Sequence, residues 1–127
     1  MTYYFAKTLD VGFDEAIDRV KAALKEEGFG VLSEIDVQHA LKAKLDVDFR
    51  PYRILGACNP PLAHKALLAE DKIGTMLPCN VVVQQAEGGT EVTAIDPVAS
   101  MAAVRNEALA PIAEEVREKL RKVIEGL

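Results

Sequence analysis

The chain has 127 residues, half of them hydrophobic and 28% charged, with a formal net charge of -5. This balance predicts one globular domain over residues 1–127, with a core that needs no disulfide or metal. The acidic charge disfavours nucleic acid as a partner. We find no run long enough to span a bilayer and no signal peptide at the N-terminus, so we expect no membrane association and a cytoplasmic location.

The first half of the chain predicts two strands and two helices. Alternation over residues 2–9 indicates a strand, and apolar residues at helical spacing over residues 13–27 indicate a helix that ends at Gly28. A strand over residues 30–35 leads to Asp36, which we expect to cap a short helix. The residues expected to face inward are Phe13, Ile17, Val20 and Leu24 in the first helix, and Val37, Leu41 and Leu45 in the second.

The second half predicts three more strands. Residues 52–58 form a strand, and Asn59 then caps a helix whose first turn holds two prolines. A hairpin turn at Glu87-Gly88-Gly89 joins strands over residues 79–85 and 90–95. One face of the strand over residues 52–58 is expected to carry Tyr52, Ile54, Gly56 and Cys58. A final helix over residues 108–125 has an inner stripe of Leu109, Ile112, Val116, Leu120, Val123 and Ile124.

The order of elements indicates the fold class. Strands and helices do not alternate regularly enough for a doubly wound sheet, and the hairpin is typical of antiparallel pairing. We therefore predict an α+β domain with a largely antiparallel sheet covered by helices on one face.

Three segments carry a family resemblance. Residues 28–32 read Gly-Phe-Gly-Val-Leu, residues 50–60 include Gly-Ala-Cys-Asn-Pro, and residues 77–83 read Leu-Pro-Cys-Asn-Val-Val-Val. With these segments the chain resembles, over nearly its whole length, the domain-of-unknown-function family 302. The resemblance implies a β-α-β4-α arrangement with short inserted helices, related in shape to the TATA-box-binding-protein fold. It implies no activity.

The side chains that could react or bind a ligand are expected to lie at one edge of the predicted sheet. Cys58 ends one strand, Cys79 begins the next, and Asp96 follows the partner strand of the hairpin, so antiparallel neighbours bring all three to one edge. His64 and Met101 lie close enough in sequence to join them. A right-handed parallel crossover between the third and fourth strands would instead place the two cysteines at opposite ends.

The ligand chemistry of this set is that of soft metals. Cys58 precedes a helix N-terminus, which favours a thiolate. Two thiolates with His64 suit Zn(II), and adding Met101 suits Cu(I). The simpler interpretation, that both cysteines are packed as small hydrophobic side chains, outweighs this one, because buried cysteine is common and their spacing matches no metal motif.

Other polar residues have structural explanations beside functional ones. His64 is more simply a solvated helix residue than a ligand, Asn59 is explained by capping, and Asn80 by a strand start. The basic cluster of Lys42, Lys44, Arg50 and Arg53 is more simply a solvated rim than an anion site. Within the cluster Arg53 is the best ligand candidate, since it lies opposite the face of Tyr52 and Ile54.

The face of the sheet without helices suggests self-association. We expect it to carry either Val82 and Ala94, or Val81 and Val83 with Ile95, and neither set suits full exposure to water. This favours a homodimer through the face or its edge. The competing arrangement is a monomer in which the short helices over residues 37–45 and 62–68 cover that face.

Three functional hypotheses follow. The favoured one is a small non-enzymatic module that binds a small ligand or soft metal with Cys58, Asn59, His64, Cys79, Asn80, Asp96 or Arg53. The second is a thiol-dependent enzyme or redox sensor that uses Cys58. The third is a structural or dimerisation domain without a ligand. The sequence identifies no particular ligand.

Overall fold

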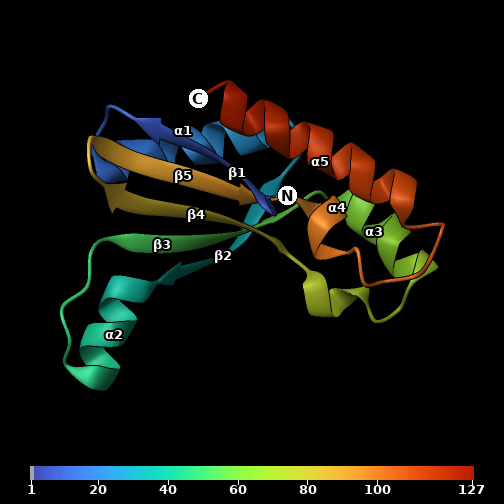
Figure 1. Ribbon diagram of the computed structural model, residues 1–127, viewed down its shortest axis with the longest axis horizontal. Coiled ribbons are helices and arrows are strands. Elements are labelled where there is room, and N and C mark those ends of the chain that lie inside the picture. The colour runs from blue at the N-terminus through green and yellow to red at the C-terminus, as the bar shows by residue number, and fades with distance from the viewer. Residues whose placement is uncertain (1) are drawn as a thin grey trace.

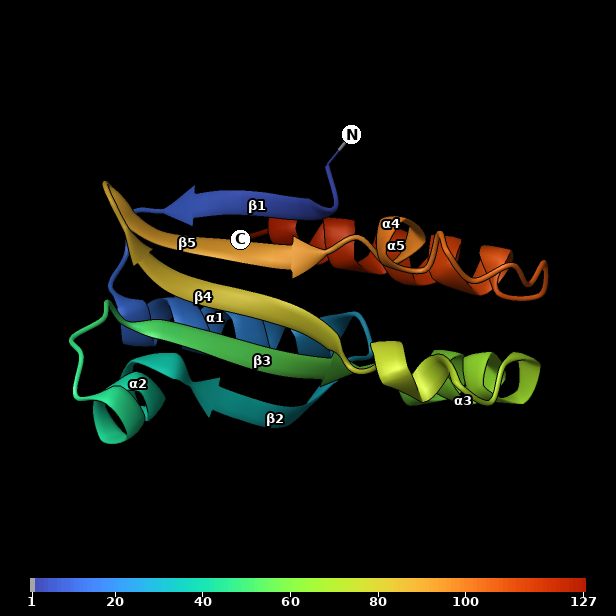
Figure 2. The same cartoon turned by 60° about the horizontal axis from the view of Figure 1, so that its bottom comes forward.

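In a computed structural model that describes residues 2–127, one five-stranded antiparallel sheet forms the centre of the protein. Its strand order is β1-β5-β4-β3-β2, and each neighbouring pair is antiparallel (Figures 1 and 2). The predicted α+β class and the β-α-β4-α order with inserted short helices are confirmed, although Met1 lies outside the described residues. The elements are β1 (Tyr4–Leu9), α1 (Phe13–Glu26), β2 (Gly30–Asp36), α2 (Val37–Leu45), β3 (Tyr52–Cys58), α3 (Pro60–Ala69), the 3-10 helix η1 (Ile73–Met76), β4 (Cys79–Ala86), β5 (Gly89–Ile95), α4 (Pro97–Ser100) and α5 (Ala110–Glu125).

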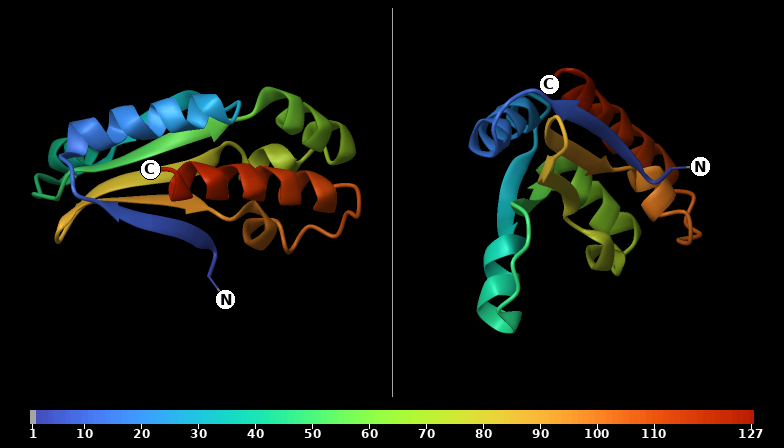
Figure 3. Two further views of the ribbon diagram at one scale, coloured as in Figure 1. Left: turned by 90° about the horizontal axis from the view of Figure 1, so that it is seen from above. Right: turned by 60° about the vertical axis from the view of Figure 1, so that its left-hand side comes forward.

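Helices α1 and α5 cover one face of the sheet and enclose the core (Figures 1 and 3). The stripes predicted for both helices are confirmed: Ile17, Val20 and Leu24 of α1 meet Leu120 and Ile124 of α5 in one buried cluster. The sheet side of the cluster consists of Leu55, Ala57, Cys79, Val81, Val83, Val92 and Ala94. Each residue of the cluster removes apolar area from water, and this burial stabilises the sheet–helix layer arrangement.

Polar caps define where three helices begin, as the sequence predicts for two of them. Asp36 accepts a hydrogen bond from the backbone N–H of His39, and Asn59 accepts one from Leu62. Asp96 caps α4 in the same way, with its Oδ1 atom accepting from the N–H of Val98 at 3.0 Å. Each cap satisfies a backbone donor that the first turn of a helix leaves unpaired.

The uncovered face of the sheet, which we call the open face, has a different composition from either predicted set. Cross-strand partners share a face, and the register pairs Val81 with Ala94 and Val82 with Thr93. Val81 and Ala94 are therefore both buried under the helices, while Val82 is on the open face. A one-residue error in register exchanges the two faces of a strand, which is why neither predicted set is correct. The open face carries Tyr4, Ala6, Thr8, Ser33, Ile35, Tyr52, Ile54, Gly56, Asn80, Val82, Gln84, Glu91, Thr93 and Ile95.

Helix α2 differs most from expectation. The sequence predicts that Val37, Leu41 and Leu45 face inward, but α2 contains no buried residue and Leu45 is 65% exposed. The physical reason is position: α2 projects from the β2–β3 side of the sheet, away from α1 and α5 (Figures 1 and 3). Neither α2 nor α3 covers the open face, where Ile35 is 51% exposed, so the arrangement with a covered face is wrong. Within residues 2–127, no helix has the length and apolar character needed to cross a membrane.

Candidate functional site

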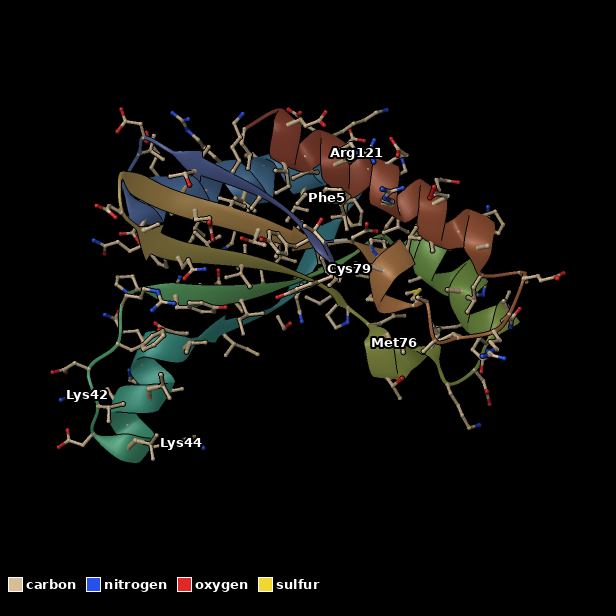
Figure 4. All side chains as sticks on the ribbon, viewed as in Figure 1. Phe5, Lys42, Lys44, Met76, Cys79 and Arg121 are labelled. Carbon is tan, nitrogen blue, oxygen red and sulfur yellow. The ribbon has the colours of Figure 1, made fainter. Side chains whose placement is uncertain are left out.

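The two cysteines meet at one end of the sheet. Cys79 is the cross-strand partner of Ala57, the residue before Cys58. Asp96 directly follows β5 and begins α4 at the same end. The antiparallel topology therefore brings Cys58, Cys79 and Asp96 to one edge, as predicted, and excludes the parallel crossover. Figure 4 shows Cys79 at this end of the sheet, close to α4.

An apolar pocket lies at this end of the sheet, where β3 and β4 meet the helices beyond them. It encloses about 30 Å³. Three sulfur-bearing residues, Cys58, Cys79 and Met101, line it together with Asn59, its single polar side chain. The remaining lining comes from Phe29, Ala57, Leu62, Ala63, Ala66, Leu77, Pro78, Pro97, Leu109, Ile112, Ala113 and Val116. The pocket thus joins residues from both halves of the chain.

The Cys79 thiol is held in its neutral form. Its side chain is buried, and the residue is 7% exposed. Burial, and to a smaller extent the negative charge of a nearby Cys58 thiolate, together raise the pKa of the Cys79 thiol to about 11. A neutral thiol is a poor nucleophile. Cys79 is therefore not suited to attack an electrophile in the free protein, whereas Cys58 is half-exposed.

The backbone around the pocket is fixed by two close contacts. The Asn59 side chain donates a hydrogen bond to the carbonyl oxygen of Glu27 at 3.3 Å while it caps α3, so it joins the end of α1 to the start of α3. A Cβ atom at position 56 would overlap Ser33 Oγ and Pro78 Cγ, so only glycine lets the segment before Cys79 lie against β3. Both contacts position the cysteines on rigid elements.

Asp96 acts beside the pocket and not inside it. The residue is 8% exposed, and its Oδ2 atom lies 3.3 Å from Nε of Arg117 on α5. The Asp96 N–H also donates to the carbonyl oxygen of Tyr3 at 2.8 Å. Since the same carboxylate caps α4, Asp96 holds α4 and α5 against the sheet, and these helices supply Pro97 and Ile112 to the pocket wall. The sequence predicts a ligand role for Asp96 and does not predict its pairing with Arg117. One charged residue among many on a helix gives no sign of which partner it has.

Three predicted site residues are not brought to the pocket. His64 is exposed on the side of α3 that faces away from it, because Leu62, Ala63 and Ala66 are the α3 residues that line the pocket. Asn80 is exposed on the open face. Arg53 is five residues from Cys58 on β3 and pairs instead with Glu34 and Asp36 at 3.9 and 3.5 Å.

The predicted zinc ligands are consequently not assembled. Across residues 2–127, no group of three or more His, Cys, Asp and Glu side chains is placed to hold a metal ion. Cys58, Cys79 and Met101 are the sulfur-bearing residues among those that line the pocket. Of the wall residues, Leu109, Ile112 and Val116 fall on the predicted stripe of the last helix. For Phe29, Leu62 and Pro97, the sequence offers only their apolar character, which does not indicate that they line a pocket.

Thiol labelling should distinguish the two cysteines. With excess iodoacetamide near neutral pH, we expect Cys58 to be alkylated first and Cys79 to remain unmodified until the protein is unfolded. With a pKa of about 11, fewer than about one Cys79 thiol in a thousand is ionised near neutral pH. Peptide mass spectrometry over a time course measures both rates, and urea-unfolded protein is the control. Equal rates in the folded protein would show that Cys79 is not protected.

The fold and pocket together define a small α+β domain with a sulfur-lined apolar pocket at one end of an antiparallel sheet. The chain belongs to the family described as "Domain of unknown function DUF302", whose model matches residues 5–127. It is also similar to a solved structure, the uncharacterized conserved protein DUF302 from Bacillus stearothermophilus. That protein is 32% identical, with 98% of each chain covered and a TM-score of 0.91. Among curated proteins, none matches the chain.

Proposed function

We propose that the protein is a non-enzymatic binding module that holds one soft, monovalent metal ion, copper(I), in the pocket at the end of the sheet. The observation that supports the proposal is that Cys58, Cys79 and Met101 all line one apolar pocket. The three residues come from β3, β4 and the end of α4, so the set forms only when the chain is folded.

The size of the pocket favours an ion over an organic ligand. A cavity of about 30 Å³ has room for a water-sized guest. Pockets that hold drug-sized molecules measure roughly 300–1,000 Å³. An organic ligand would therefore require the elements around the pocket to move apart.

The chemistry of the donors selects the ion. Thiolate and thioether sulfur are soft ligands that prefer Cu(I) to hard cations. Zn(II) prefers four ligands from cysteine, histidine and carboxylate groups, and His64 does not line the pocket. A monovalent ion also suits apolar surroundings, because one thiolate neutralises its charge and two leave a single negative charge.

A thiol-dependent enzyme has less support. Cys58 is half-exposed next to the start of α3, which favours reactivity at that residue. Among the described residues that line the pocket, however, Asn59 is the only polar side chain, so the pocket itself contains no general base for either thiol. Asp96, the nearest candidate by sequence, is occupied by Arg117 and the α4 cap.

Copper(I) titration under reducing, oxygen-free conditions tests the proposal. With a chromogenic Cu(I) chelator as competitor, we expect one ion to bind per chain. Cys58→Ser and Cys79→Ala should each weaken binding by at least roughly 100-fold, because each removes a principal ligand. Met101→Leu, which preserves side-chain volume, should weaken binding by roughly 10-fold, because a thioether is the weaker donor.

Two matched controls lie outside the pocket. Met76→Leu makes the same chemical change at an exposed methionine on η1, which is labelled in Figure 4, and His64→Ala removes an exposed imidazole. Both should bind Cu(I) as the unaltered protein does. If neither cysteine variant weakens binding while circular dichroism shows that both are folded, the site is not in this pocket.

A further inference from the structure

The open face has few charged residues although the protein is acidic. Of the fourteen residues that the strand register places on it, Glu91 alone is formally charged, while the chain as a whole has a net charge of -5. The carboxylate of Glu91 is engaged with polar neighbours, accepting hydrogen bonds from Gln84 and Thr93. Arg50, which precedes β3, is the one basic residue within residues 2–127 that is hydrogen-bonded to this face, where it donates to Gln84. A single arginine does not make the basic patch that a phosphate backbone needs, which favours a protein partner.

Aromatic side chains surround a hollow on this face. Tyr3, Tyr4 and Tyr52 line it, with Val82 and Thr93 among the other lining residues, and its volume is about 340 Å³. Tyr3 and Tyr4 touch edge to face, with ring centroids 5.0 Å apart. Tyrosines that project beside a hollow give one surface both a protrusion and a recess. In a two-fold dimer, the tyrosines of each copy can insert into the hollow of the other.

Helix α2 extends the same side of the molecule. It is a nine-residue helix without a buried residue, and an isolated helix of that length is marginally stable in water. Figure 3 shows that it stands away from α1 and α5, beside the open face. Leu45, and Val47 just after it, remain exposed there. These residues are available to a partner that already covers the sheet.

The open face and α2 together offer an area of the size that a stable dimer requires. Five strands about 4.8 Å apart, each about six residues long at about 3.3 Å per residue, give a flat footprint of roughly 480 Å². A standard interface buries about 800 Å² of accessible surface on each partner. The sheet alone supplies more than half of this, and the exposed residues of α2 supply a continuous extension.

We propose that the open face and α2 bind a second copy of this chain, forming a two-fold homodimer. Because Glu91 is the one formal charge among the strand residues of this face, two identical acidic chains can meet there with little repulsion. The pockets that contain Cys58 and Cys79 lie at the end of each sheet beyond the contact, so metal binding does not depend on the dimer.

Sedimentation equilibrium over a range from about one to about 100 micromolar tests this proposal. The protein should have twice the single-chain mass of 13.8 kDa. Val82→Lys in the centre of the face and Ile35→Lys on its edge should each weaken the dimer by at least roughly 100-fold, because each buries an unpaired charge in the contact.

The matched control is Leu68→Lys, which makes a similar change at a residue that is 75% exposed on α3, away from the open face. It should remain a dimer. Ile35 is already exposed, so its variant stays folded even if Val82→Lys does not. A single-chain mass for the unaltered protein at the highest concentration overturns the proposal. So does a dimer that Leu68→Lys disrupts and Ile35→Lys leaves intact.

Discussion

Replacing Asp96 with alanine should lower the free energy of unfolding by about 2–3 kcal/mol, more than a typical surface substitution. The change removes the cap of α4, worth about 1 kcal/mol, and takes from the Arg117 guanidinium its buried carboxylate partner, so that only the more exposed Glu114 remains. Because α4 and α5 supply walls of the pocket, the variant should also lose affinity for copper(I).

A second capping aspartate provides the matched comparison. Asp36 caps α2 and pairs with Arg53, but its side chain is 44% exposed. Asp36→Ala should therefore cost only about 1 kcal/mol. Asp96→Asn retains a capping oxygen and loses the charge, so its stability should lie between those of the unaltered protein and Asp96→Ala. Urea unfolding measures all three variants, and equal losses for Asp36→Ala and Asp96→Ala would show that burial of the ion pair contributes nothing.

Raising the pH should destabilise the protein through Cys79 by about 2 kcal/mol by pH 11, compared with about pH 8. Burial raises the pKa of this thiol from 9.0 to about 11 in the folded state. The unfolded chain therefore releases the proton first. The neutral thiol stabilises the fold fully below pH 9, and this contribution is lost as the pH rises through 11.

Other groups titrate in the same range, so the test requires a variant without the thiol. Cys79→Ala should be less stable than the unaltered protein near pH 8, because it leaves a cavity in the core. The difference in unfolding free energy between the two proteins should shrink by about 2 kcal/mol between pH 8 and pH 11. A difference that stays constant with pH would mean that the Cys79 thiol is hydrated in the folded state.

Much of the fold could be predicted because local signals and global topology agree. The hairpin at Gly88-Gly89, the caps at Asp36 and Asn59, and the stripe of α5 each lie where the sequence indicates. Register could not be predicted, because Val81, Val82 and Val83 are alike and alternation alone does not show which of them face the helices. The position of α2 depends on whether another element lies close enough for its apolar side chains to pack against. The pattern of residues within α2 does not show this.

The site was predictable to the extent that topology determines it. The antiparallel order places Cys58 and Cys79 at one edge whatever the details of the loops. His64 was misplaced because closeness in sequence to a helix start says nothing of which side of the helix faces the pocket. Arg53 was misplaced because a strand of seven residues separates its two ends by roughly 20 Å, so a residue at its start cannot reach a site at its end.

Anomalous diffraction from crystals grown with copper(I), measured on both sides of the copper absorption edge, tests the central proposal most directly. We expect one peak per chain in the pocket, within bonding distance of the sulfur atoms of Cys58 and Cys79, with Met101 as a third ligand. The peak should be absent from crystals of Cys79→Ala. A pocket without a peak, or copper bound only at the exposed His39 or His64, would contradict the proposal that this sulfur-lined pocket is the functional site.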